Sequence, residues 1–128
     1  MKIYRCNKCG NILIVANDGG VIPTCCNEQM ELLEAKTHDG IIEKHLPVVK
    51  CCEQEICVEV GEKLHPMEKE HYIQMIILET NKGYYLRKLT AKDEPKAKFK
   101  ICESELPITV YEYCNIHSLY KRDVNCEK

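Results

Sequence analysis

Four cysteines in the first part of the chain have the spacing of a metal site. Cys6 and Cys9 form a Cys-x-x-Cys-Gly knuckle, and 15 residues separate Cys9 from the adjacent pair Cys25 and Cys26. Four thiolates arranged as a tetrahedron suit zinc or iron. A module of fewer than about 40 residues buries too little surface to hold itself together, so the ion would contribute to folding. The spacing leaves open a redox-active iron or a structural zinc, although adjacent cysteines are unusual for a zinc ribbon.

Four of the five histidines lie in short patterns with charged residues, proline or cysteine. The patterns are Glu-Lys-His ending at His45, His-Pro-Met starting at His65, a histidine six residues later at His71, and Tyr-Cys-Asn-x-His ending at His117. A single histidine is more often a surface or core residue than a ligand, so no pattern is informative alone. Together they indicate a second metal site, because the two-residue gap after Cys114 lets one loop supply a thiolate and an imidazole.

The two sets together resemble the desulfoferrodoxin family. The cysteine set, followed by Met30, is similar to the desulforedoxin-like domain of that family, and the histidine patterns are similar to its superoxide reductase domain. The resemblance covers nearly the whole chain. One departure is Tyr72, at a position where the family commonly has tryptophan.

The resemblance implies two iron ions per chain. The first would be a rubredoxin-like centre that carries electrons, with the ligands Cys6, Cys9, Cys25 and Cys26. The second would be a mononuclear ferrous ion with the ligands His45, His65, His71, Cys114 and His117. Five ligands leave one octahedral position open, and a thiolate opposite that position pushes electron density onto the iron.

The resemblance also implies catalytic roles for the two charged residues before His45. Lys44 would lie near the open position, attract the superoxide anion and help organise the water that supplies protons. Glu43 would occupy the sixth position after the iron is oxidised. Without the adjacent ligand, the same pair would be interpreted as an exposed charged turn.

The activity implied is that of a superoxide reductase. Superoxide would take one electron and two protons to become hydrogen peroxide, without regenerating oxygen, and an external donor such as rubredoxin would reduce the iron again. We expect a homodimer, because pairing would cover the strand edges of the small module. The alternative is a rubredoxin-like electron carrier without superoxide chemistry, which would gain nothing from an open coordination position. A zinc-stabilised binding module is disfavoured by the histidine-rich second site.

The composition limits which class of protein the chain belongs to and where in the cell it is expected. Lys plus Arg number 18 and Asp plus Glu 20, so a formal charge of −2 provides no basic field for nucleic acid. With no export signal recognised and no apolar run of about 20 residues, we expect a cytoplasmic protein that does not bind a membrane. Five of the ten cysteines are interpreted as reduced thiols outside any metal site. They are Cys51, Cys52, Cys57, Cys102 and Cys126.

Short alternating and β-branched runs predict an all-β protein. We expect a desulforedoxin-like four-cysteine iron domain over residues 1–36, with a hairpin turn at 17–20. Residues 37–128 are predicted to form an immunoglobulin-like β-sandwich, the superoxide reductase (neelaredoxin-like) domain. Its strands are expected at 47–52, 55–60, 71–79, 84–89, 96–101 and 109–113. In the strand at 96–101, Ala97 and Phe99 should be buried and the intervening lysines exposed.

Overall fold

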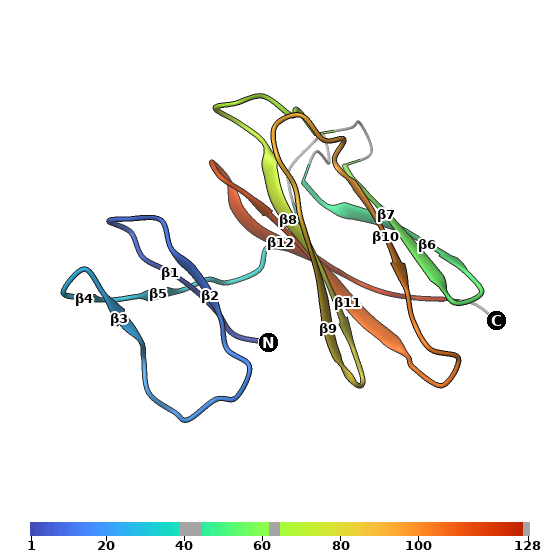
Figure 1. Ribbon diagram of the computed structural model, residues 1–128, viewed down its shortest axis with the longest axis horizontal. Coiled ribbons are helices and arrows are strands. Elements are labelled where there is room, and N and C mark those ends of the chain that lie inside the picture. The colour runs from blue at the N-terminus through green and yellow to red at the C-terminus, as the bar shows by residue number, and fades with distance from the viewer. Residues whose placement is uncertain (39–44, 62–64, 127–128) are drawn as a thin grey trace. The chain divides into compact units, whose positions relative to one another are not determined.

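The computed structural model describes residues 1–38, 45–61 and 65–126, and these contain strands and no helix. The chain divides into two compact units, Met1–Glu34 and Ala35–Lys128, whose strands are labelled in Figure 1. The prediction of an all-β chain, with a small N-terminal domain and a β-sandwich, is confirmed. In the described part of the chain, no helix is available that could cross a membrane.

The first unit is built from five very short strands. The strands β1 (Ile3–Arg5), β2 (Ile12–Ile14) and β5 (Glu31–Leu32) form one sheet in the order β2-β1-β5, while β3 (Thr24–Cys25) pairs with β4 (Glu28–Gln29). The hairpin predicted at 17–20 is wrong, because β2 pairs with β1 and β3 with β4, so no paired strands flank that turn. The buried cluster is small and contains Tyr4, Cys6 and Met30.

The second unit is a sandwich of two antiparallel sheets. One sheet has the order β10-β7-β6 and the other β12-β11-β8-β9. The strands are β6 (Pro47–Cys52), β7 (Glu55–Val60), β8 (Ile73–Thr80), β9 (Gly83–Lys88), β10 (Lys96–Lys100), β11 (Pro107–Cys114) and β12 (Ser118–Asp123). Side chains of both sheets meet in one core, for example Val58 and Phe99 from the first and Ile76 and Val110 from the second.

Strand β10 shows the predicted alternation. Ala97 and Phe99 are buried, whereas the three lysines between and beside them are exposed. On the exposed face Lys96 forms a 3.6 Å ion pair with Glu59 of the neighbouring strand β7. This face is therefore a solvated strand surface, where an exposed pair contributes little to stability.

Strand β12 was not predicted. Its six residues contain only the neighbouring apolar pair Leu119 and Tyr120, so the two-residue period that marks a strand is missing. The strand forms because β11 pairs with it along its whole length, from Thr109 opposite Asp123 to Cys114 opposite Ser118.

Two cysteines predicted to be free thiols are joined. Cys51 of β6 forms a disulfide with Cys126, across 75 residues of sequence, whereas Cys52, Cys57 and Cys102 are free. Cys51 and Cys126 both pack against the sandwich core, while Cys52, the next residue of β6, is exposed. A contact this distant in sequence leaves no local spacing signal, so the prediction of reduced thiols is wrong for this pair.

Candidate metal centres

The four N-terminal cysteines converge on one point in the first unit. Cys6 follows β1, Cys9 lies in the next turn, and Cys25 and Cys26 lie at the turn between β3 and β4. Their four sulfurs lie within 4.8 Å of one another. The first turn depends on Gly10, whose φ of 83° is accessible to glycine at little cost.

The sulfur separations match those of a tetrahedral metal site. The Cys9 and Cys25 sulfurs are 3.6 Å apart, and the Cys25 and Cys26 sulfurs are 3.9 Å apart. Four sulfurs bound to one ion at about 2.3 Å in a tetrahedron are about 3.8 Å apart. Cys26 has a φ of 53°, a left-handed backbone conformation. This conformation accompanies a turn in which two adjacent cysteines direct their sulfurs to the same point, so adjacency does not prevent tetrahedral geometry.

The electrostatics of the group favour a cation. The backbone amides of Cys9 and Lys8 lower the pKa of the Cys6 thiol to about 6, and the Cys9 amide lies 3.5 Å from that sulfur. The pKa of Cys25 is instead raised to about 12 by its hydrogen bonds with the thiols of Cys9 and Cys6. Neighbouring sulfurs therefore compete for protons, and a bound cation would stabilise all of them as thiolates.

The histidine and cysteine group is formed at one end of the sandwich. His45 precedes β6, His65 and His71 lie between β7 and β8, Cys114 ends β11, and His117 lies in the turn before β12. The pairing of Pro47 with Val60 places the ends of β6 and β7 together in one sheet, and the pairings of Cys114 with Ile73 and Ser118 do the same for β8, β11 and β12 in the other. One donor atom from each of the five residues lies within 4.8 Å of the others.

An irregularity in the sheet lies next to Cys114. Tyr113 faces Met75, but the next residue, Cys114, faces Ile73, so β8 has one additional residue at this point. Such a bulge changes the direction of nearby side chains and is common beside functional sites. Cys114 is completely buried and belongs to the sandwich core.

Two of the imidazoles each have a buried ring nitrogen that could bind a metal ion. Among the described residues, His65 Nε2 and His71 Nε2 are buried without a hydrogen-bond partner. His65 Nδ1 lies 2.7 Å from the Pro66 carbonyl oxygen, to which it donates when it carries the ring proton, leaving Nε2 free to bind a metal. Burial lowers the pKa of His65 to about 4, so its ring is neutral at physiological pH.

The remaining donor atoms also have separations that suit one ion. His117 Nδ1 lies 2.9 Å from His45 Nε2, close to the ~3 Å between two nitrogens bound at right angles at about 2.1 Å. The Cys114 sulfur is 3.9 Å from His117 Nδ1. Four imidazoles and one thiolate suit a transition metal such as iron, and the donor set and spacing therefore fit one such ion.

Asn115 was not predicted from the sequence to be a positioning residue. Its side-chain oxygen accepts a hydrogen bond from the Tyr72 amide at 2.9 Å, and its side-chain nitrogen donates to the Glu70 carbonyl, also at 2.9 Å. These bonds fix the segment that carries His71 to the turn that carries Cys114 and His117. The signal was present in the Cys-Asn-x-His pattern, where the asparagine was treated only as part of the motif.

Lys36 and Tyr120 were also missed. The Tyr120 ring stacks on His45, with ring centres 4.7 Å apart and an interplanar angle of 13°. Lys36 Nζ donates to the His117 carbonyl at 3.1 Å and lies 5.1 Å from the centre of the Tyr120 ring. The Lys36 side chain therefore contacts the backbone of one candidate ligand, His117, and the ring that stacks on another, His45. Glu43 and Lys44, the predicted catalytic pair, lie outside the described residues.

Comparisons with known proteins find one family over both units. The family model for desulfoferrodoxin matches residues 37–123, and that for the desulfoferrodoxin N-terminal domain matches residues 1–33. A desulfoferrodoxin homolog of Methanothermobacter thermautotrophicus is 44% identical over 93% of this chain and 95% of its own length. The desulfoferrodoxin of Syntrophotalea carbinolica is 39% identical over 96% of both chains.

Solved structures show the same fold. The superoxide reductase of Treponema pallidum matches with a TM-score of 0.83 at 28% identity, over 94% of this chain and 96% of that one. The superoxide reductase (1Fe-SOR) of Giardia intestinalis matches with a TM-score of 0.55 at 25% identity, over 66% of this chain and 99% of its own. The fold and the two ligand groups define a metal-binding β protein of two units. The chain belongs to the desulfoferrodoxin family.

The role of Cys114 can be tested by spectroscopy. We expect Cys114→Ser, in oxidised protein loaded with iron, to lose the thiolate charge-transfer absorption of the histidine-rich site, because this set has one sulfur. The absorption of the four-cysteine site should remain. Cys57→Ser is the matched control, since Cys57 is a free cysteine of the same unit outside both groups. If the Cys114 variant keeps both absorption features, Cys114 is not a ligand.

Proposed function

We propose that this chain is a superoxide reductase with two iron ions, which converts superoxide to hydrogen peroxide at the histidine-rich site. The observation that carries the proposal is the group of five donor atoms at one end of the sandwich. Five protein ligands leave one position of an octahedron for a small molecule. The family membership and the likeness to the Treponema pallidum superoxide reductase support the same activity.

The burial of the five residues defines an enclosed side and an accessible side. Cys114 is completely buried and His65 is 2% exposed, whereas His117 is exposed. Among the described residues, the side of His117 is therefore the accessible one, from which a diatomic anion could reach the group. A ferrous ion held here would supply the electron that superoxide accepts.

Other residues of the chain would orient the candidate ligands and guide superoxide and protons to the site. Pro66 and Asn115 fix the orientation of the segments that carry His65 and His71. We propose that Lys44 attracts superoxide and helps to deliver protons through water, and that Glu43 replaces the departed product as a ligand. Lys36, beside His117, adds a second local positive charge in a chain with a net charge of −2.

The four-cysteine site would transfer electrons. Four sulfurs around one ion would complete a tetrahedron and leave no position for substrate. We propose that it accepts electrons from a rubredoxin-like donor and that the protein functions as a cytoplasmic homodimer. The alternative is an electron carrier without superoxide chemistry. Such a carrier would not need a site whose five protein ligands leave one coordination position open.

Product stoichiometry tests the proposed reaction. We expect pre-reduced protein to form one hydrogen peroxide per superoxide consumed and no oxygen, because the electron comes from the protein. Pulsed generation of superoxide, followed by peroxide and oxygen assays, measures both products. Oxygen formed at half the superoxide consumed would show dismutation, and unchanged superoxide decay would indicate the electron carrier.

The proposed role of Lys44 has a kinetic test. Lys44→Ala should slow the second-order reaction with superoxide by roughly tenfold and flatten its dependence on ionic strength, because a local attracting charge is removed. Lys98→Ala is the control, since Lys98 lies on the exposed face of β10. Pulse radiolysis that gives the same rate and salt dependence for the Lys44 variant and the wild type would exclude the role.

A further inference from the structure

The Cys51–Cys126 disulfide lies at the far end of β6 from the histidine group. β6 begins at Pro47, two residues after His45, and Cys51 is its fifth residue. At about 3.3 Å per residue, six residues from His45 to Cys51 span roughly 20 Å. The disulfide is therefore remote from the candidate metal ligands, although Cys51 lies on β6, the strand that begins two residues after His45.

The disulfide attaches the C-terminal segment to the sandwich. β12 ends at Asp123, the Val124 amide donates to the Ile108 carbonyl at 2.8 Å, and Cys126 follows two residues later. Cys51 belongs to the sheet β10-β7-β6, whereas the C-terminal segment continues from the other sheet. The bond is consequently a covalent connection between the two sheets. Val124 and Cys126 also pack against the core, which brings the two sulfurs together.

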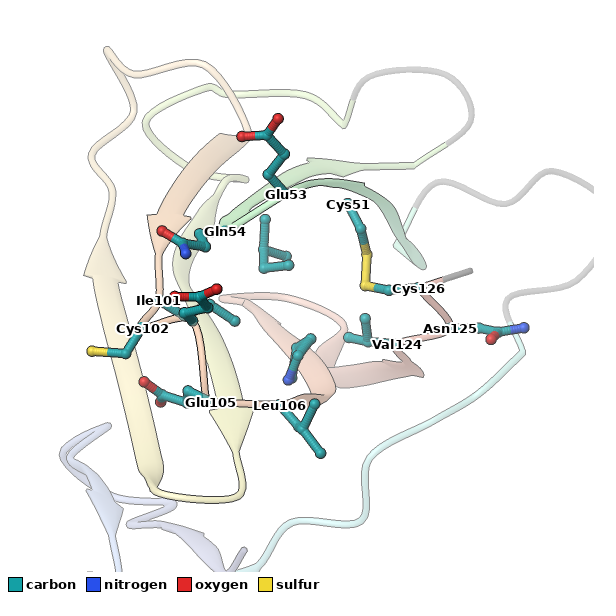
Figure 2. Close-up of a pocket in the computed structure, with 13 residues that line it drawn as sticks. Cys51, Glu53, Gln54, Ile101, Cys102, Glu105, Leu106, Val124, Asn125 and Cys126 are labelled. Carbon is teal, nitrogen blue, oxygen red and sulfur yellow. A yellow bond between two sulfur atoms is a disulfide. The ribbon is translucent and has the colours of Figure 1, made fainter. Parts of the chain in front are cut away.

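Small reagents can reach this bond. Cys51 and Cys126 are only partly buried, and both line a pocket of about 490 Å³. Figure 2 shows the bonded sulfurs at one side of this pocket and the Cys102 sulfur pointing away from them. Cys102 is free and exposed, and Cys52 is exposed beside Cys51 in sequence. The pair that the fold brings together is therefore Cys51 with Cys126 and not either neighbouring cysteine.

We propose that Cys51 and Cys126 form a reversible redox pair, which hydrogen peroxide closes into a disulfide that holds the C-terminal segment against the sheet. Only the source of the oxidant rests on the proposed function, whose product is hydrogen peroxide. One thiolate attacks an oxygen of the peroxide and the O–O bond breaks, which gives a sulfenic acid and a hydroxide that takes up a proton from solvent to become water. The second thiol then attacks the sulfenic sulfur, forms the S–S bond and releases a second water. A dithiol reductant opens the bond by exchange and becomes a disulfide itself.

Closure has a physical consequence for the second unit. The bond joins positions 75 residues apart, so it lowers the conformational entropy of the unfolded chain. We expect the oxidised form to have a Tm higher by on the order of 10 °C than the reduced form. The pair thus stabilises the sandwich under the conditions in which peroxide accumulates.

The experiment uses the full chain with both metal sites intact. Protein is reduced with dithiothreitol, desalted without oxygen, and treated with one equivalent of hydrogen peroxide or left untreated. Free thiols are then alkylated, and peptide mass spectrometry measures the fraction of Cys51 linked to Cys126. The Tm of each sample is recorded in parallel. Cys51→Ser and Cys126→Ser remove the pair, while Cys52→Ser is the matched control because it changes the adjacent, exposed thiol.

The expected result is a linked peptide after peroxide in the wild type and in Cys52→Ser, loss of the link after dithiothreitol, and a raised Tm only in the linked samples. Separate alkylation of Cys51 and Cys126 after peroxide would overturn the proposal. A bond that dithiothreitol cannot open in the folded protein, or a Tm that does not differ between linked and reduced wild type, would also overturn it. Because the peroxide is added, failure of superoxide reduction would refute the proposed function and leave this result unaffected.

Discussion

Five side chains from three separate segments must place their donor atoms around one point, and the second unit is arranged by this requirement. The three segments meet because β6, β7, β8, β11 and β12 all begin or end at the same end of the sandwich. The irregular pairing beside Cys114, the hydrogen bonds of Asn115 and the stacking of Tyr120 on His45 then set the directions of individual ligands. Cys114 is completely buried in the core beneath these ligands. A charged thiolate is costly to bury unless a cation lies beside it.

The first unit meets a similar requirement with much less protein. Its buried cluster contains Tyr4, Cys6 and Met30, so one of its few core residues is also a candidate ligand. Removal of the ion would leave four sulfurs within 4.8 Å of one another and little apolar surface to hold them there. The two units would therefore differ in what a bound metal does: in the first it would supply folding energy, whereas in the second the sandwich has its own core.

Much of this could be predicted from sequence where the signal is local. The bounds of β6 and β7 agree with the expected strands at 47–52 and 55–60, and the alternation around Phe99 gave the buried face of β10. Both candidate ligand groups were predicted from short motifs, and the structure brings the residues of each group close together. The missed features depend on distant partners. β12 forms because β11 is beside it, Lys36 reaches His117 across 81 residues, and Cys51 meets Cys126 across 75. The roles of Glu43 and Lys44 stay predictions.

We propose that the histidine-rich group is an iron site, distinct from the four-cysteine site. X-ray diffraction from crystals of the iron-loaded chain, collected on both sides of the iron absorption edge, tests it most directly. We expect two anomalous peaks per chain that depend on iron, one surrounded by four sulfurs and one by the donor atoms of His45, His65, His71, Cys114 and His117. A single iron peak at the four-cysteine group, with none among the histidines, would contradict it.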